Sequence, residues 1–555
     1  MVEHMKWYGW GRADTSFGHE DKPSLAPFVA DVVGVDLNAP SQHIPDLAEL
    51  DVPSPRHPAS LRDAMTAAVG AEHVHTDDLD RVVHTYGKSL RDLVRLRAGV
   101  FGRLPDLVIY PGDEDDTVAV LAAALAADAV VVPFGGGSNI VGSLEVPADE
   151  QRPVVSVDLG RLDKVLEIDD DSRLARVQAG VLGPDMERQL NAAGWTMGHF
   201  PDSFTHSTLG GWIATRSSGM QSDVYGDIGQ ITKAVRVVTP GGILVTRAVP
   251  SEATGPSVLQ MVLGSEGRLG LITEATVQVH RLPAKRAVHA YLFPSFNAGV
   301  EAMREIAESE ASPTITRVSD AHETRFSFAT RKASHGVSGL VSAGLTRYLT
   351  VRGWELDRMC LSFVGYEGSP AHVAGQKAAV GAIVRRHGGI GIGTGPGTLY
   401  DQKKFDTPYI RDFLLERGAL ADVSETATSW SKLLPLYRTV VADADKAFAS
   451  LGVQGWLMCH LSHSYHSGAC LYFTFAFAPA PGDARVPQYD LVKSAVQQAF
   501  LDAGGTLSHH HAVGHEHARW LAQDISPVGT DVLGVLFAGV DPGRNLNPGA
   551  VLTDR

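Results

Sequence analysis

Cysteine and positive charge are both scarce in this sequence. Of its 555 residues only three are cysteines, Cys360, Cys459 and Cys470. They show no CxxC spacing and one is left over if two pair, so we expect no disulfide framework, and a reducing compartment fits. Lys and Arg total 48 against 63 Asp and Glu, without a strong basic cluster. Because nucleic acids are bound by dense Lys and Arg, this composition disfavours a nucleic-acid partner.

Long hydrophobic runs are also missing. The first residues, MVEHMKWYGWGRAD, lack the apolar stretch of a signal peptide. The longest near-apolar segment, 118–134, is interrupted by Asp128 and is better explained by a helix followed by a strand than by a membrane span. We therefore predict a cytoplasmic protein, and we leave open a peripheral contact with the inner membrane surface and a homodimer.

The length and the ordinary composition predict a globular protein of two or more domains. Hydrophobic residues make up 44% and charged residues 20% of the chain. The succession of short strands and amphipathic helices predicts an α+β fold. We divide it into a helical leader (1–100), a first domain (101–282), a second domain (283–530) and a C-terminal segment (531–555).

Several individual helices can be predicted from their hydrophobic spacing. Leu and Val at helical intervals predict one helix over 77–97 in the leader. In the second domain, amphipathic stretches predict helices over 298–308, 372–387 and 488–503.

A glycine-rich loop follows two buried strands in the first domain. A strand at 107–110 precedes a helix at 117–127, which Asp113 or Asp115 can cap. The next strand runs directly into the loop GGGSN at 135–139. Three consecutive glycines expose main-chain N–H groups, and such a nest binds phosphate oxygens. The loop is neither GxGxxG nor GxxxxGK[ST], so Rossmann and P-loop folds are disfavoured.

Two further segments add to this phosphate-binding chemistry. Residues 201–219, PDSFTHSTLGGWIATRSSG, combine hydroxyls, glycines and one Arg with few other charges. A diphosphate requires small donors, main-chain access and limited positive charge, and this composition supplies them. Residues 264–273, GSEGRLGLIT, form a glycine turn entering a strand, where main-chain groups could contact an isoalloxazine or a ribityl chain.

Together these motifs resemble a known superfamily. The GGG loop, the PDSxxxSTxGG segment and the GSEGxLGxITEAT segment, in this order and spacing, are similar to the vanillyl-alcohol-oxidase-type FAD domain. MKWYGWG near the start, YIRD at 409–412, YHSGACLYF from Tyr465 and SHHHAVG from Ser508 extend the resemblance to the alkylglycerone-phosphate synthase (alkyldihydroxyacetonephosphate synthase) family. This resemblance covers nearly the whole chain.

The resemblance implies a two-lobed FAD-binding domain that the C-terminal end of the chain completes, with a cap domain over the flavin. FAD is expected to bind non-covalently, because no His lies in the loop at 133–142. By motif match, the residues implied in holding FAD are Pro133, Phe134, Gly135, Gly136, Gly137, Ser138, Asn139, Asp202, Ser203, Ser207, Thr208, Thr215, Arg216, Ser217, Ser218, Glu266, Gly267, Leu269, Gly270 and Ile272.

The activity that the resemblance implies is a redox-neutral exchange. An acylated dihydroxyacetone phosphate loses its fatty acid through an adduct at flavin N5, and a long-chain alcohol takes its place to give an ether lipid. Tyr465 is implied as the catalytic acid/base, with His509, His510 and His511 lining the active site. A Tyr phenol can relay a proton to a leaving carboxylate, and His can take a proton next to a carbonyl. On a strand, His509 and His511 would share one face and His510 would point away.

Two arginines match the family at positions suited to the phosphate of the substrate. Arg411 lies in YIRD and Arg317 in TITRVSD. A guanidinium group binds phosphate in a bidentate geometry, so both are candidate substrate-binding residues for a small-molecule lipid.

The chain also departs from the family pattern. His460 and His463 replace an Arg and a Gln, His515 replaces a Lys, and the run at 401–406 is polar where the family is apolar. An FAD-linked oxidase or dehydrogenase of a 2-hydroxy acid or related alcohol is therefore the alternative function, since the fold alone does not choose between the two.

The histidines after Ser508 raise the question of a metal. His509, His511, His515 and His517 could act as ligands, but only Glu516 offers a carboxylate nearby. We predict no metal at these positions.

Overall fold

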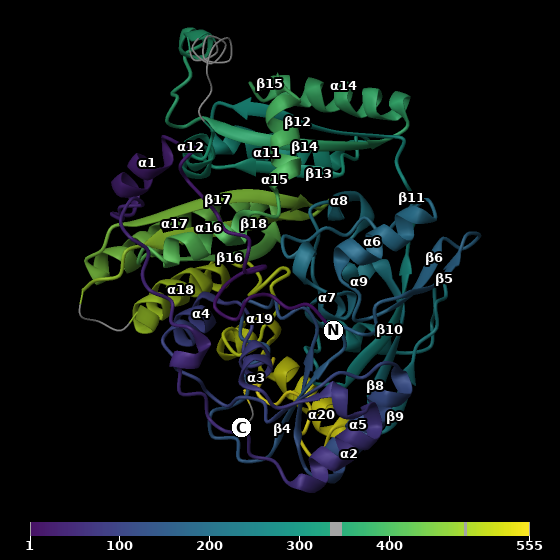
Figure 1. The fold of residues 1–555 in the computed structure, drawn as a ribbon. Coiled ribbons are helices and arrows are strands. Elements are labelled where there is room, and N and C mark those ends of the chain that lie inside the picture. The colour runs from purple at the N-terminus through teal and green to yellow at the C-terminus, as the bar shows by residue number, and fades with distance from the viewer. Residues whose placement is uncertain (1, 333–343, 345–346, 482–484, 554–555) are drawn as a thin grey trace.

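A computed structural model describes residues 2–332, 344, 347–481 and 485–553 (Figure 1). Strands and helices occur in both halves of the described chain, and most strand pairs are antiparallel. The predicted α+β class is confirmed. No helix within these residue ranges is both long and apolar enough to cross a membrane.

The first domain contains a small sheet built around the predicted glycine loop. Its order is β1–β2–β4–β3, with β2, β4 and β3 parallel. Strands β2 and β4 are buried at every residue, as expected for strands covered on both faces. The strands are β1 (Val74–His75), β2 (Leu107–Ile109), β3 (Val130–Phe134) and β4 (Val154–Asp158).

Helix α5 (Glu114–Ala126) covers this sheet together with α2 (Ala59–Val69). The predicted helix begins three residues earlier than expected. Asp113 is its N-cap and accepts the N–H of Asp116 at 2.8 Å. Acidic residues in the first turn fit the positive end of the helix dipole, which explains the earlier start.

A five-stranded antiparallel sheet completes the first domain. Its order is β5–β6–β10–β8–β9. The strands are β5 (Val165–Asp169), β6 (Leu174–Gln178), β8 (Thr232–Thr239), β9 (Gly242–Val245) and β10 (Leu271–Gln278). The helices beside it are α6 (Gly183–Ala192), α7 (Leu209–Thr215), α8 (Ser222–Tyr225), α9 (Ile228–Ile231) and α10 (Val258–Val262). The short strands β7 (Trp195–Thr196) and β11 (His280–Arg281) pair with each other.

The second domain is a seven-stranded antiparallel sheet of order β15–β12–β14–β13–β17–β18–β16. Its strands are β12 (Lys285–Phe293), β13 (Ile315–Ser319), β14 (Cys360–Gly368), β15 (Ile390–Gly393), β16 (Leu420–Ser429), β17 (Gly455–Ser464) and β18 (Gly468–Phe477). Its helices are α11 (Phe296–Glu308), α12 (Ala321–Ala329), α14 (Pro370–Arg386), α15 (Gly395–Lys403), α16 (Thr407–Leu415), α17 (Trp430–Leu451) and α18 (Arg485–Asp502). The three helices predicted in this domain are confirmed as α11, α14 and α18, each with slightly longer bounds.

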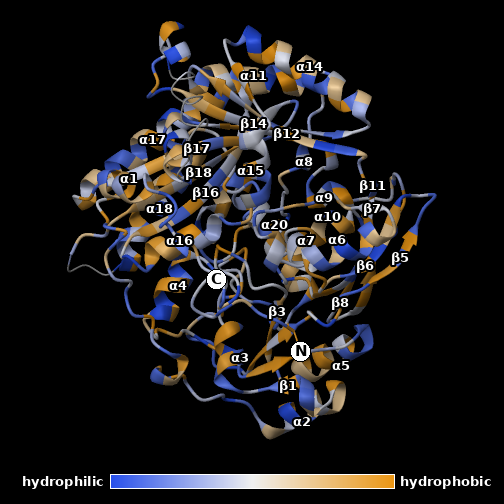
Figure 2. Cartoon of the chain, turned by 45° about the horizontal axis from the view of Figure 1, so that its top comes forward, coloured by the Kyte–Doolittle hydropathy of each residue, from blue (hydrophilic) through white to orange (hydrophobic). Residues whose placement is uncertain are grey.

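The core of the second domain lies between this sheet and four of its helices. Apolar side chains of α11, α14, α17 and α18 form one buried cluster with the strands. Figure 2 shows hydrophobic and hydrophilic residues mixed along α11, α14 and α17, as expected for helices with one face on a sheet. The other face of the sheet packs against α12, α15, α16 and the leader.

The leader joins the two domains. Helix α1 (Leu25–Val32) packs with α16 and β16 of the second domain. The single helix predicted over 77–97 is wrong, because the structure has two, α3 (Asp78–Val83) and α4 (Leu90–Arg97). Gly87 in the break lies against the loop, where a Cβ would stand 2.2 Å from the Asn139 carbonyl oxygen. A capping box at Ser89 and Asp92 then starts the second helix.

The end of the described chain returns to the first domain. Helices α19 (Leu521–Ile525) and α20 (Pro527–Val540), yellow in Figure 1, precede it. Leu546 then pairs in parallel with Val131 of β3. The Asn547 amide donates to the carbonyls of Ser143 and Glu266, at 2.9 and 2.6 Å. The last described residues therefore contact both the strand that leads into the glycine loop and the segments beside that loop.

Candidate active site

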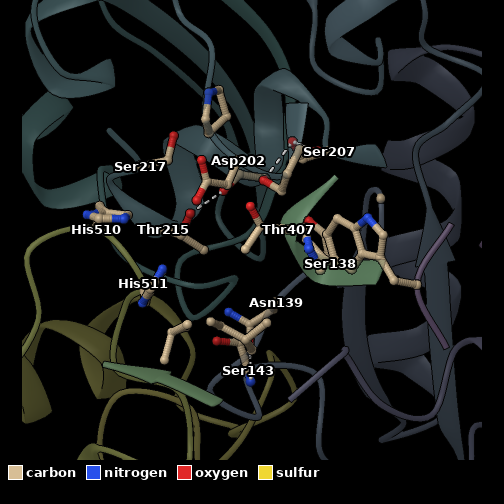
Figure 3. Close-up of a pocket in the computed structure, with 18 of the residues that line it drawn as sticks. Ser138, Asn139, Ser143, Asp202, Ser207, Thr215, Ser217, Thr407, His510 and His511 are labelled. Carbon is tan, nitrogen blue, oxygen red and sulfur yellow. Dashed lines mark hydrogen bonds between the residues drawn. The ribbon is translucent and has the colours of Figure 1, made fainter. Parts of the chain in front are cut away.

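A cavity of about 300 Å³ is lined by residues of the first domain, the second domain and the leader. The first domain contributes the glycine loop and the segments near 201–218 and 266–272, and the second contributes α16 and strands β16, β17 and β18. Figure 3 shows the polar part, with His510 and His511 on one side and Ser138 and Thr407 toward the other. Motifs far apart in the sequence therefore surround one space.

The glycine loop lies directly against the hydroxyl-rich segment. A Cβ at Gly136 would stand 1.9 Å from the His206 carbonyl oxygen, and one at Gly135 would stand 2.4 Å from Thr208 Oγ1. Gly137 has a φ of +63°, a left-handed backbone conformation that residues other than glycine rarely adopt. Gly135 and Gly136 are therefore required because neighbouring atoms leave no room for a side chain, and Gly137 is required because of its backbone conformation.

The loop presents unused hydrogen-bond donors to the cavity. Among the hydrogen bonds of the described residues, none is donated by the main-chain N–H of Gly136, Gly137 or Ser138, and all three residues line the cavity. Main-chain N–H groups are strong hydrogen-bond donors, so these three are available to an acceptor of a group bound in the cavity. Successive N–H groups of this kind suit phosphate oxygens.

Most of the residues expected to hold FAD line this cavity. Those that do are Pro133, Phe134, Gly135, Gly136, Gly137, Ser138, Asn139, Asp202, Ser203, Ser207, Thr208, Thr215, Ser217, Ser218, Glu266, Gly267, Gly270 and Ile272. Two lie elsewhere. The Arg216 guanidinium donates to Gln260 and to the Leu263 carbonyl, and Leu269 is buried in the apolar core of the first domain.

Glu266 holds the site together through its side chain. Its carboxylate accepts the N–H groups of Val513 and Gly514 at 2.9 to 3.1 Å, and the hydroxyl of Ser143. Burial raises the pKa of Glu266, although these donors oppose the rise. This residue ties the segment that follows the three histidines to the loop.

The three consecutive histidines do not form a strand. Residues 508–511 bend around Glu425 of β16, whose carboxylate accepts the N–H groups of His509, His510 and His511 at 2.5, 3.1 and 2.9 Å. The prediction that His509 and His511 share a strand face is therefore wrong. Three successive N–H groups point to one buried carboxylate here, so the side chains do not alternate between two faces as they would in a strand.

Burial controls the protonation of this cluster. It lowers the pKa of His510 to about 3 and that of His511 to about 4, although the nearby Glu425 opposes the shift. Burial also lowers the pKa of His463 well below its ordinary value. For Glu425, burial raises the pKa, but the three imidazoles and the N–H donors outweigh it and hold the pKa low. At neutral pH His510, His511 and His463 are therefore neutral, and Glu425 is a carboxylate.

Tyr465 is connected to the cavity by a chain of hydrogen bonds through His509 and His510. Its hydroxyl lies 2.6 Å from His509 Nε2 and 2.9 Å from Asp227 Oδ2. His509 Nδ1 lies 2.9 Å from His510 Nδ1, and His510 lines the cavity. Burial, followed by the charge of Asp227, raises the pKa of Tyr465, so the phenol stays protonated. A proton can pass along this chain of three side chains.

A second, smaller cavity of about 40 Å³ adjoins the histidines and shares Asp202, Tyr472 and His510 with the main one. Arg317 lines it, and Glu323 at 2.5 Å and His460 at 3.1 Å hold its guanidinium in place. Burial lowers the pKa of Arg317, but Glu323 outweighs it and the pKa stays raised. This arginine is a fixed cation that lines the same small cavity as His510.

Arg411 occupies a different place. It lines the main cavity from α16, and its guanidinium donates to the Lys88 carbonyl at 2.5 Å and to the adjacent Asp412. It therefore also connects α16 to the leader. The two candidate phosphate-binding arginines do not line the same cavity.

The main cavity has an apolar arm next to the polar part. Its lining includes Phe28, Val29, Val32 and Val33 at α1, Phe326 of α12, Ile410 and Leu414 of α16, and Trp456, Met458, Phe475 and Ala476 of the sheet. The polar run at 401–406 lies outside this lining, at the end of α15, where Lys404 pairs with Asp401 at 3.0 Å. An aliphatic chain fits such an arm.

The histidines weighed as metal ligands do not gather at one point. His517 bonds to Gln497 at 3.1 Å, and His515 packs beside Gly142 and Gly549. His509 instead approaches His510, Glu425 and Cys470. Of these four, His509, His510 and Glu425 take part in the hydrogen bonds of the active site described above.

Sequence reasoning missed three carboxylates that organise the site, Asp227, Glu323 and Glu425. Each acts on a partner more than 80 residues away, apart from the Glu323–Arg317 pair. None belongs to a recognisable motif. A signal in the sequence was available only for Glu323, which follows Arg317 by six residues on the next helix.

The fold and the site define a class of protein. Residues 105–247 match the family described as FAD binding domain, and residues 282–551 match the family described as FAD linked oxidases, C-terminal domain. The open N–H groups of the loop, the hydroxyl-rich wall and the cavity between domains fit FAD. The protein is a flavoenzyme of this two-domain class, with FAD as its cofactor.

Comparison with known proteins identifies the family. The chain is 37% identical to the alkyldihydroxyacetonephosphate synthase of Dictyostelium discoideum, over 99% of this chain and 93% of that protein. It is 36% identical to the synthase of Trypanosoma brucei brucei, over 99% and 92%. A crystal structure of an alkyldihydroxyacetonephosphate synthase superposes with a TM-score of 0.84 at 34% identity, covering 98% of both chains. The chain belongs to the alkyldihydroxyacetonephosphate synthase family.

Proposed function

We propose that the protein exchanges the acyl chain of an acyl-dihydroxyacetone phosphate for a fatty alcohol. The bond between the C1 carbon and the acyloxy oxygen breaks, and the fatty acid leaves. The alcohol oxygen then bonds to the same carbon, and the alcohol proton is released. No net oxidation occurs. The observation that carries this proposal is a cavity that combines a nucleotide-binding loop with an apolar arm and that adjoins, at His510, a smaller cavity with a fixed arginine.

Arg317 binds the phosphate in this proposal. Its guanidinium is oriented by Glu323 and lines the small cavity with His463 and His510. Arg411 is the second candidate, placed on α16 in the main cavity. A charge-assisted bidentate contact from a pre-oriented guanidinium is the stronger arrangement, which favours Arg317.

The histidines and Tyr465 move the protons. In the free protein, His510 is neutral because burial lowers its pKa to about 3. A phosphate bound at Arg317 would bring negative charge next to His510 and raise its pKa toward neutrality. His510 can then take a proton from the substrate and pass it through His509 to the Tyr465–Asp227 pair, and return it to the leaving carboxylate.

FAD, when bound, would supply an electrophilic ring for the exchange at the substrate carbon. The N–H groups of Gly136, Gly137 and Ser138 would hold its diphosphate. The apolar arm beneath α1 accommodates the acyl chain first and the alkyl chain afterwards.

The test supplies acyl-dihydroxyacetone phosphate with a radiolabelled fatty alcohol to the purified holoenzyme. We expect labelled ether lipid and one fatty acid released per ether bond formed. A 2-hydroxy acid, added without these substrates, should leave the flavin oxidised. Bleaching of the flavin by the hydroxy acid, with no ether product, would instead establish the oxidase alternative.

We further propose a cytoplasmic protein that contacts membranes peripherally and forms a homodimer. An apolar stripe on α20 supports surface contacts, since Val528, Val532 and Val535 are 71%, 63% and 75% exposed. Light scattering measures the oligomeric state, and sedimentation with neutral lipid vesicles measures membrane contact. A monomer that stays in the supernatant when vesicles are pelleted would rule out both.

A further inference from the structure

Outside the active site, a cluster of two histidines and one aspartate lies behind the glycine loop. Its members are His4 of the leader, His84 after α3 and Asp158 at the end of β4. The Asp158 Oδ2 atom lies 2.7 Å from His4 Nε2 and 3.0 Å from His84 Nε2. His84 and Asp158 have fully buried side chains, and His4 is 16% exposed. Three segments far apart in the sequence thus point their polar atoms at one spot.

The hydrogen bonds around this cluster indicate which ring nitrogen of His84 carries a proton. His84 Nδ1 lies 2.7 Å from the Asp80 carbonyl oxygen, which can only accept, so Nδ1 carries a proton. In neutral His84, Nε2 then has a lone pair directed at Asp158 Oδ2, which is itself an acceptor. Two acceptors in contact repel each other unless a cation lies between them. That cation is either a second proton on a buried imidazole or a metal ion.

The surroundings resemble the outer shell of a metal site. A His whose Nδ1–H donates to a carbonyl presents Nε2 for coordination, and this is the usual arrangement around protein metals. The other oxygen of Asp158 accepts the Gly160 N–H at 2.7 Å, which fixes the carboxylate. The three ligand atoms lie within 4.8 Å of one another. Tetrahedral zinc with bonds of about 2.0–2.2 Å needs ligand atoms roughly 3.3 Å apart, so shifts of a few tenths of an ångström admit the ion.

We propose that His4, His84 and Asp158 bind one divalent transition-metal ion of the zinc type, with water at the fourth position on the exposed side of His4. The prediction of no metal concerns the histidines after Ser508, and this cluster lies elsewhere. Borderline-soft ions such as Zn²⁺ prefer two imidazoles and one carboxylate over an all-oxygen set.

The position of the cluster gives the ion a structural role. Asp158 is paired with Phe134, the last residue of β3 before the glycine loop. The His84 ring lies 4.1 Å from the Phe134 ring, centroid to centroid, and Phe134 in turn packs under Gly137. A bound ion would fasten the start of the leader to the strand end that carries the phosphate-binding loop. It is remote from the proposed proton chain at Tyr465, so the proposal is independent of the transferase activity.

The experiment measures metal in the full-length holoenzyme, purified without a polyhistidine tag. Mass spectrometry of the metal content should give about one zinc per chain, beside one FAD. The variants His4→Gln and His84→Gln should each lose the zinc while keeping FAD. His75→Gln is the matched control, because His75 also pairs with an aspartate, Asp80 at 2.5 Å, but has no second histidine. Its ring packs against Tyr110, as the rings of His4 and His84 do. This control variant should keep the zinc.

Cobalt replacement makes the test independent of stability. After removal of zinc with a chelator, added Co²⁺ should produce the intense visible bands of a tetrahedral site in wild type and in His75→Gln, but not in His4→Gln. His4 is partly exposed near the chain start, so its variant should fold even if His84→Gln does not. A wild-type protein that contains no zinc and takes up no Co²⁺ overturns the proposal. So does metal that persists in both cluster variants, since it must then lie elsewhere.

Discussion

The two ends of the polar cavity use different chemical groups of the chain, main-chain donors at one end and titratable side chains at the other. At the glycine loop, main-chain N–H groups face the cavity and no titratable side chain is needed. At the histidine end, buried imidazoles, a phenol and two carboxylates, Asp227 and Glu425, form one hydrogen-bonded group. Main-chain N–H donors are neutral and do not titrate, whereas imidazoles gain a positive charge below their pKa. The first end therefore suits permanent retention of a cofactor, and the second suits proton transfer.

This contrast predicts that changes at the two ends separate cofactor binding from turnover. Substitutions in the loop should release FAD, and substitutions near His510 should stop the reaction with FAD still bound.

The largest effect is expected for Tyr465→Phe. The variant loses the hydroxyl between Asp227 and His509, so the proton chain is cut. General acid–base contributions are typically about 10²- to 10⁴-fold, and we expect kcat to fall by that factor. Flavin absorbance per chain should not change. Tyr291→Phe is the control, because it removes another buried hydroxyl, paired with Tyr366 in the core of the second domain. Equal losses in both variants would contradict a specific role for Tyr465.

Gly136→Ala should act at the other end. Its Cβ would collide with the His206 carbonyl, which belongs to the main chain and cannot rotate away. Overpacking of this kind costs about 1–3 kcal/mol, equivalent to roughly a 10- to 100-fold loss of FAD affinity if the loop shifts. Flavin released on dilution measures it. Gly375→Ala in the exposed part of α14, where a Cβ meets nothing within 4 Å, should retain FAD. Full retention in Gly136→Ala would remove the loop from the cofactor site.

The two arginines refine the comparison. Arg317→Lys replaces a pre-oriented bidentate donor with a point charge, and we expect the KM for the phosphate substrate to rise by about tenfold, near 1.4 kcal/mol. Arg411→Lys should raise it less, because Arg411 also binds the Lys88 carbonyl and Asp412. Steady-state kinetics at fixed alcohol concentration distinguishes them. The reverse order would place the phosphate in the main cavity beside α16.

The smallest expected change is a shift of the acid limb in the pH profile of kcat/KM. Glu425 opposes the burial that lowers the pKa of His510 to about 3 and of His511 to about 4. Removing its charge in Glu425→Gln lowers both pKa values further, so protonation of the histidines begins at lower pH. We expect the acid limb to move to lower pH, with FAD retained. Glu305→Gln, which alters a surface pair with Arg386, should leave it unmoved. A shift to higher pH would contradict the assignment.

Local signals were sufficient for the nucleotide-binding end. Consecutive glycines after a buried strand and hydroxyls beside glycines act through their own main chain, so their chemistry is visible in the sequence. Even there, Arg216 lies near the other predicted residues in sequence but points to Gln260, because its left-handed backbone turns it away from the cavity. The leader helix was predicted as one element because its apolar spacing continues through Gly87. In the structure Gly87 lies against Asn139, and a capping box at Ser89 starts the second helix.

The sequence by itself determined the class of cofactor site and the family, since glycine loops and ordered motifs carry their conformational requirements with them. Only the tertiary structure decided how the histidine end works. His509, His510 and His511 are wrapped around Glu425, which lies 84 to 86 residues earlier, and Tyr465 is paired with Asp227, 238 residues away. The protonation of a buried side chain depends on the charges that folding brings next to it, and sequence distance does not encode those neighbours.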